Sequence, residues 1–122
     1  MYQISVRKHF DAAHYLRGYK GKCEEIHGHR FEVVVAIEAE DLNDIGIVFD
    51  FSDLKNYLSA IIDRFDHICL NDISPFDSIN PSSENIARTI HEELAGQLSG
   101  VTISHIEVWE SPESKVTYIP SR

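Results

Sequence analysis

Two histidines stand two residues apart in a short stretch that also carries a thiol, Cys23-Glu24-Glu25-Ile26-His27-Gly28-His29. In an extended backbone alternate side chains point to the same face, so His27 and His29 would share one face. Two imidazoles placed in this way can chelate one metal ion, and Gly28 between them has no side chain to crowd it. The spacing therefore predicts part of a metal site that still needs a third ligand.

The third ligand is expected from the segment that precedes this stretch. Residues 2–14 begin with apolar and polar residues in alternation, which is the pattern of a strand, and residues 29–40 show a second such pattern. If the two strands pair as an antiparallel hairpin, the end of the first lies beside the start of the second. His14 then falls opposite His27 and His29. Three neutral imidazoles with an open fourth position are typical of a catalytic zinc site.

Length, charge and composition restrict the class of protein. The chain has 122 residues and no linker or repeat, so we expect a single domain over residues 1–122. A net charge of −9 makes nucleic acid and anionic membranes improbable partners. No apolar run approaches the ~18 residues of a membrane span, and the N-terminus lacks the shape of a signal peptide. Two cysteines without a disulfide framework fit the reducing cytoplasm.

The remaining elements follow from hydrophobic periodicity and capping residues. A helix capped by Asp50 or Ser52 is expected to end near residues 66–67, and a second one capped by Ser82 or Ser83 is expected to end at Gly100. Strands are predicted over residues 102–110 and 115–120. The order ββααββ indicates an α+β fold, with an antiparallel four-stranded sheet and two helices on one face. Its two open edges suggest that sheets are joined between subunits.

Several side chains have more than one interpretation from spacing alone. Cys23 could be a fourth metal ligand, which would close the site, or a base or nucleophile beside an open metal. Three basic residues lie in the loop between the two predicted strands, from residue 15 to about residue 26. This loop could be a solvated surface or could bind an anion beside the metal: Arg17, Lys20 and Lys22.

The later part of the chain has a similar set of candidates. Taken alone, Asp66-His67 is best interpreted as a helix end, with the histidine near the helix dipole. Glu110 shares a strand face with Ile106 and Val108, and a carboxylate there needs donors, such as paired N–H groups of a ligand. The other candidates are assigned to structure: Cys69 as a small buried residue, His9, His91 and His105 as structural or surface residues, and Trp109 as core or interface.

Taken together, these motifs are familiar: Phe10-Asp11-Ala12-Ala13-His14, Cys23-x3-His27-Gly28-His29, Asp50-Phe51, Asp66-His67-x2-Leu70-Asn71, Pro81-Ser82-Ser83-Glu84-Asn85 and Glu110. Over nearly the whole chain their order resembles the 6-pyruvoyl-tetrahydropterin synthase family. The three residues between Cys23 and His27 resemble the bacterial 6-carboxy-5,6,7,8-tetrahydropterin synthase branch, which belongs to queuosine precursor biosynthesis. A folate-pathway branch carries Glu in place of the cysteine, so Cys23 argues against it.

The resemblance implies an architecture and a set of residue roles. The fold would be the tunnelling fold (T-fold), in which three subunits join their sheets into a barrel, two trimers stack into a homohexamer, and active sites lie between subunits. Zinc would be bound by three residues: His14, His27 and His29. Substrate would be bound by Glu110, Ser82 and Ser83. The acid/base residues would be Cys23, Asp66 and His67.

The resemblance also implies a reaction. The substrate would be 7,8-dihydroneopterin triphosphate, and the product 6-carboxy-5,6,7,8-tetrahydropterin, with release of acetaldehyde and triphosphate. Two alternatives stay open at this point. One is 6-pyruvoyl-tetrahydropterin synthesis, which eliminates triphosphate without carbon–carbon cleavage. The other is a zinc- or pterin-binding protein without turnover, in which Cys23 closes the metal site.

Overall fold

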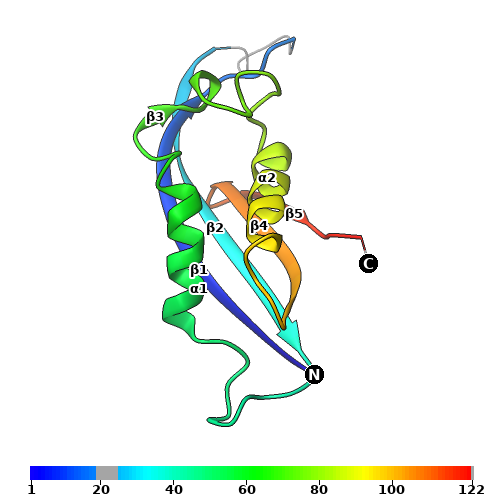
Figure 1. Ribbon diagram of the computed structural model, residues 1–122. Helices are drawn as coiled ribbons and strands as arrows, with labels where there is room; N and C mark the ends of the chain where they lie inside the picture. The colour runs from blue at the N-terminus through cyan, green and yellow to red at the C-terminus, as the bar shows by residue number, and fades with distance from the viewer. Residues whose placement is uncertain (19–24, 122) are drawn as a thin grey trace.

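The computed structural model describes residues 1–18 and 25–121. The elements follow one another along the chain as β1 (Tyr2–His14), β2 (His27–Ala39), α1 (Phe51–Ile62), β3 (Ile68–Cys69), a short 3₁₀ helix (Leu70–Asp72), α2 (Ser83–Ala95), β4 (Thr102–Ser111) and β5 (Ser114–Tyr118). Both helices cover the same face of one sheet (Figure 1). The α+β arrangement predicted from the sequence is therefore confirmed.

The sheet has the strand order β3-β1-β2-β4-β5. Strands β1 and β2 pair antiparallel along their full length, with Tyr2 opposite Ala39 and His14 opposite His27. Strand β2 also pairs with β4, and β4 with β5, both antiparallel. The second strand begins at His27, two residues earlier than expected, so both His27 and His29 lie within extended backbone.

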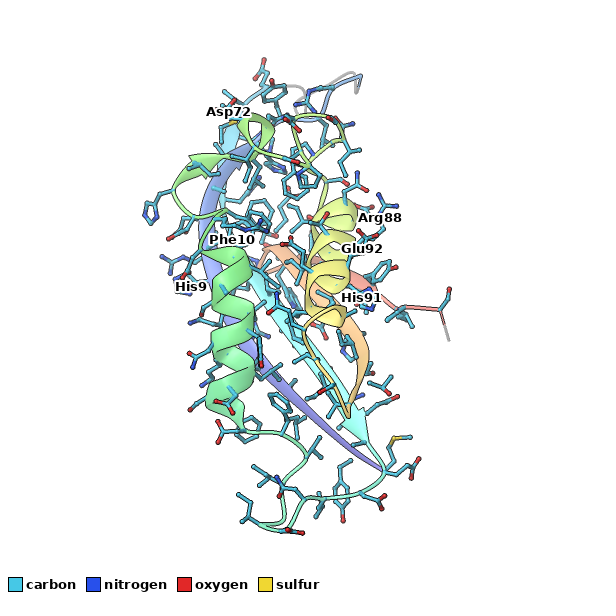
Figure 2. The ribbon with its side chains drawn as sticks, viewed as in Figure 1. His9, Phe10, Asp72, Arg88, His91 and Glu92 are labelled. Atoms are coloured by element: carbon cyan, nitrogen blue, oxygen red, sulfur yellow. The ribbon has the colours of Figure 1, made fainter. Side chains whose placement is uncertain are left out.

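The two helices begin where their capping residues predict. The Asp50 side chain accepts a hydrogen bond from the backbone of Asp53, and Ser82 accepts one from Asn85. Both bonds satisfy amide groups that a helix N-terminus leaves free. The apolar stripes of both helices then pack on the sheet. Phe10 is fully buried there, stacked on Phe31 with ring centroids 4.9 Å apart, whereas His9 on the other face of β1 is exposed (Figure 2).

Three sequence predictions about these elements are wrong. Helix α1 ends at Ile62 and does not reach residues 66–67. The chain turns after Ile62, and His67 adopts a φ of 60°, which an α-helix excludes. Helix α2 ends at Ala95, where Gly96, a poor helix former, is its C-cap. The sheet has a fifth strand, β3, which pairs parallel to β1 at Ala12 and Ala13. A strand of two residues is too short to show a periodic pattern in the sequence.

One single residue also differs from expectation. Cys69 is half-buried rather than enclosed in the core, because its strand β3 lies at the edge of the sheet. Trp109 is half-buried on the sheet face opposite the helices, where its indole Nε1 donates to Glu107 at 2.9 Å. His9, His91 and His105 lie outside the histidine cluster described below; the His91 ring contacts Tyr118 and His105 contacts Glu107. Across the described ranges, no helix combines the length and apolar character that crossing a membrane requires.

Candidate active site

Three histidines gather where β1 ends and β2 begins, on the face of the sheet that the helices cover. The ladder places His14 opposite His27 and places Ala12 opposite His29. The ring centroids lie 4.9 Å apart for His14 and His27, 5.2 Å for His14 and His29, and 4.6 Å for His27 and His29. The hairpin register predicted from the sequence therefore brings all three rings together.

Backbone carbonyls determine which ring nitrogens carry protons. The Nδ1 atom of His14 lies 2.8 Å from the Pro81 carbonyl, and that of His27 lies 2.7 Å from the Glu25 carbonyl. Because a carbonyl only accepts, both Nδ1 atoms donate, and in the neutral form of each ring Nε2 then keeps a lone pair. This is the arrangement in which carbonyls commonly orient metal-binding histidines.

The buried ring nitrogens fit a metal ion. Within residues 1–18 and 25–121, the Nε2 atoms of His14 and His29 are buried without a hydrogen-bond partner. Such atoms are costly unless something satisfies them. Burial lowers the pKa of His29, against the opposing pull of Glu110, so the neutral form that binds metal is favoured. A set of neutral imidazoles suits zinc, and also other divalent transition metals.

Glu110 lies beside this cluster, on the same face of β4 as the buried Ile106 and Val108. One carboxylate oxygen is 3.3 Å from Nε2 of His29, and the other accepts a hydrogen bond of 3.3 Å from the Ser83 hydroxyl. The contact with His29 is not aligned as a hydrogen bond. The side chain is 36% exposed, so the carboxylate can still reach a ligand.

A hollow of about 160 Å³ opens beside the cluster and is lined by His14, Leu16, His27, Ser82, Ser83, Glu84, Glu110 and residues 114–116. The predicted substrate-binding residues Ser82, Ser83 and Glu110 therefore share one hollow with two of the predicted metal ligands. Pockets that enclose a small molecule usually measure about 300–1,000 Å³. The described part of one chain therefore forms only part of such an enclosure.

Asp66 and His67 form a second group. Their side chains pair at 2.9 Å between Asp66 Oδ2 and His67 Nδ1. The backbone of Asp11 holds both, since its N–H donates to Asp66 Oδ1 at 2.8 Å and its carbonyl accepts from the His67 N–H at 2.6 Å. The hydrogen bond from Asp11 and the contact with His67 keep the pKa of Asp66 below its ordinary value. The His67 side chain is 79% exposed, so its Nε2 faces outward.

This second group does not lie in the hollow beside Glu110. His67 instead lines a separate hollow of about 560 Å³ with Asp11, Gly28, Arg30 and Cys69, and His29 lines it too. The interpretation of His67 as a helix-end residue is wrong, because four residues separate it from the end of α1 and its imidazole pairs with Asp66. Across the described residues, His67 and the predicted substrate residues therefore line different hollows.

The predicted basic loop can be judged at one residue only. Arg17 donates to the Phe76 carbonyl at 2.9 Å and also contacts the carbonyls of Asn71 and Ile79 at 3.4 Å. Its guanidinium therefore makes contacts within the fold, while the residue stays exposed, and anion binding by this loop stays a prediction. Cys23, Lys20 and Lys22 lie outside the described residues.

Sequence reasoning missed the groups that support these side chains. The Pro81 carbonyl orients His14, and the backbone of Asp11 holds Asp66 and His67. The side chains of Asn71 and Asn80 bind the segment that follows His14. Backbone groups carry no sequence signal, and an asparagine in a loop is usually solvated, so no pattern in the sequence marks these contacts.

Comparison with known proteins agrees with this geometry. A protein related at 37% identity is the 6-carboxy-5,6,7,8-tetrahydropterin synthase of Synechocystis sp., matched over 93% of this chain and 89% of its own. A second, also 37% identical, is the dihydroneopterin monophosphate aldolase of Pyrococcus furiosus, with 91% of each chain covered. The structure of Caenorhabditis elegans 6-pyruvoyl tetrahydropterin synthase superposes with a TM-score of 0.89 at 28% identity, covering 98% of this chain and 96% of that one.

The fold of the single chain is thus that of a T-fold subunit, as expected from the sequence. The family model described as 6-pyruvoyl tetrahydropterin synthase matches residues 3–121, almost the entire chain. The chain belongs to the 6-pyruvoyl tetrahydropterin synthase family.

Proposed function

We propose that this protein is a zinc-dependent lyase that converts 7,8-dihydroneopterin triphosphate to 6-carboxy-5,6,7,8-tetrahydropterin, with release of acetaldehyde and triphosphate, in the cytoplasmic pathway to queuosine. The observation that carries the proposal is the cluster of three histidines with Glu110 beside it, whose ligand atoms lie within 4.8 Å of one another. The name of the Synechocystis relative, 6-carboxy-5,6,7,8-tetrahydropterin synthase, supports the choice of product.

His14, His27 and His29 would hold the zinc ion through Nε2. When bound by three neutral ligands, zinc keeps its full charge and acidifies a coordinated hydroxyl group. The protein's own contribution is to present the Nε2 lone pairs of these histidines to the ion. The Pro81 and Glu25 carbonyls do this by holding the proton on Nδ1 of His14 and His27.

Glu110 and the two serines would bind the pterin ring. A carboxylate can accept two parallel N–H bonds, which matches the amino group and ring N–H of a pterin. The Ser83 hydroxyl donates to Glu110 and so holds the carboxylate in place. Ser82 caps α2 with its oxygen and still has its hydroxyl proton to donate.

Cys23, Asp66 and His67 would move protons. Asp66 holds the proton on Nδ1 of His67, so the exposed Nε2 of the neutral ring can accept a proton. Cys23 would act as a thiolate on the opposite side of the substrate. Because His67 lies away from the hollow beside Glu110, we infer that a neighbouring copy of the chain supplies its acid/base pair.

Assembly into a homohexamer, as a dimer of trimers, would complete such sites. Strand β3 pairs with the outer edge of β1 only at Ala12 and Ala13, and the Asp11 backbone is bound by Asp66 and His67, so residues 2–10 keep backbone groups for another strand. The hollow of about 160 Å³ in one chain is also too small to enclose a pterin triphosphate. Both features support sheets joined into a barrel between subunits.

The test is to incubate zinc-loaded protein with 7,8-dihydroneopterin triphosphate and to assay acetaldehyde and the pterin product together. Acetaldehyde with a carboxylated pterin supports the proposal, whereas a pyruvoyl pterin without acetaldehyde indicates the simpler synthase. Since a relative is named dihydroneopterin monophosphate aldolase, 7,8-dihydroneopterin monophosphate must be assayed in parallel as an alternative substrate. Turnover of the monophosphate alone would contradict the proposed substrate.

Cys23→Ala separates the lyase from a binding protein without turnover. The lyase should keep its zinc and lose activity, because the three histidines suffice for the metal. A closed structural site should lose zinc with the thiol. Metal content after desalting and acetaldehyde release, measured on the same sample, distinguish the two.

A further inference from the structure

The outer edge of β1 is hydrogen-bonded in an unusual way around His14. At Ala12 and Ala13 the partner is the backbone of β3, in parallel pairing. Beyond His14 the partner is a side chain: the Asn71 amide accepts from the Tyr15 N–H and donates to the Tyr15 carbonyl, both at 3.0 Å. Asn71 is only 4% exposed, so both bonds are shielded from water.

A second asparagine repeats this contact two residues further on. Asn80 accepts from the Arg17 N–H at 2.9 Å and donates to the Arg17 carbonyl at 3.0 Å. A primary amide offers the same donor and acceptor as a peptide group. Asn71 and Asn80 therefore replace a neighbouring strand along the segment that follows His14, and they extend the hydrogen-bonded edge of β1 through Arg17.

The same loop also orients the His14 ring. Pro81, adjacent to Asn80, places its carbonyl 2.8 Å from Nδ1 of His14. The Asn80 carbonyl is held in turn by the Asn85 side chain at 2.9 Å. Asn80 and Pro81 thus form one short segment that leads directly into α2. This segment holds both the backbone that follows His14 and the proton on the His14 ring.

We propose that Asn71 and Asn80 are positioning residues of the metal site, which hold His14 so that its Nε2 meets the other two histidines. The inference rests on the proposed function, because it takes His14 as a metal ligand. The proposed function does not require this positioning role, since the pairing of β1 with β2 could hold His14 by itself. Partners that orient a ligand typically change metal affinity about 10- to 100-fold when they are lost.

The experiment measures metal affinity in Asn80→Ala and Asn71→Ala by competition with a chromophoric chelator, with Zn²⁺ and with Co²⁺. We expect binding about 10- to 100-fold weaker than in wild type, and a changed Co²⁺ visible spectrum, which reports ligand geometry. Asn80→Asp keeps the acceptor for the Arg17 N–H and loses the donor, so it should restore part of the affinity.

Asn43→Ala is the matched control. Asn43 also binds loop backbone with its side chain, accepting from Ile45 and Ile47 at 3.1 Å, but it lies in the connection between β2 and α1. This variant should lose a similar pair of bonds and keep wild-type metal affinity. If it weakened metal binding as much as Asn80→Ala, the effect would be general destabilisation and the proposal would be overturned.

The remaining outcomes separate this inference from the proposed function. Unchanged affinity and Co²⁺ spectrum in Asn71→Ala and Asn80→Ala, with metal bound to wild type and lost in His14→Ala, would overturn the positioning role alone. A folded wild-type protein that bound neither metal would overturn both. Should the alanine variants not fold, Asn80→Asp decides: wild-type affinity and spectrum would refute the inference, and weaker binding would support it.

Discussion

Glu110→Gln is the sharpest test of the proposed substrate site. Glu110 is the carboxylate beside the histidine cluster, and its Oε2 already accepts from Ser83. Glutamine has nearly the same shape but replaces one acceptor oxygen with an N–H₂ group and removes the negative charge. A ligand that offers two N–H groups would then keep one hydrogen bond, lose the other and face a donor in its place.

The expected loss follows from the strength of a hydrogen bond to a charged group, about 1.5–3 kcal/mol. Each 1.4 kcal/mol corresponds to about tenfold in Kd. Pterin affinity should therefore fall about 10- to 150-fold. Because the side chain is 36% exposed, water partly replaces the lost bond, which favours the lower half of this range. Zinc content should stay at the wild-type value, since the three imidazoles are unchanged.

The assay is a fluorescence titration of zinc-loaded protein with an oxidised pterin such as neopterin, with metal content measured on the same samples. Glu84→Gln is the control, because Glu84 lines the same hollow and the substitution removes the same charge. Equal pterin affinity in Glu110→Gln and wild type would refute the reasoning. So would an equal loss in both variants, since the effect would then be general electrostatics. Loss of zinc in Glu110→Gln would identify the carboxylate as a metal ligand instead.

Three further predictions concern stability. The pKa of Asp66 lies below its ordinary value of 3.8 in the folded chain, so its ionised form stabilises the fold above about pH 4 and this contribution disappears as the pH falls further. Asp66→Asn should thus be less stable than wild type at pH 7 by urea unfolding, and the gap should narrow as the pH falls below about 4; a gap independent of pH would contradict this. Phe10→Ala removes a fully buried ring stacked on Phe31 and should cost about 3–5 kcal/mol of unfolding free energy; a loss below 1 kcal/mol would contradict this packing. Ser82→Ala removes the cap on Asn85 and should cost about 0.5–2 kcal/mol in the same assay, and no loss would refute the cap.

Local patterns were sufficient for much of the fold and for the histidine cluster. A strand alternates its side chains with a period of two, so the spacing of His27 and His29 already places them on one face. The apolar stripes of α1 and α2 place both helices on the sheet, and the capping residues locate their starts within two residues. The third histidine followed from the antiparallel register, which the observed pairing of His14 with His27 confirms.

Helix ends and the edge of the sheet were less predictable. The apolar stripe of α1 continues to Phe65, but the helix ends at Ile62 because residues 63–67 turn back toward β1. Strand β3 exists because that turn delivers two residues beside Ala12 and Ala13. Such features depend on where a distant segment lies, so a window of sequence does not contain them.

The sequence by itself determined which side chains make up the candidate site, because residue type and period are local properties of the chain. Tertiary structure alone decided what holds those ligands and how they are grouped. Asp66 and His67 are held by the backbone of Asp11, 55 positions away from Asp66, and His67 lines a different hollow from Glu110. Asn80 meets Arg17 across 63 positions. Hydrogen bonds between distant segments form only after the core has packed, and no local pattern specifies them.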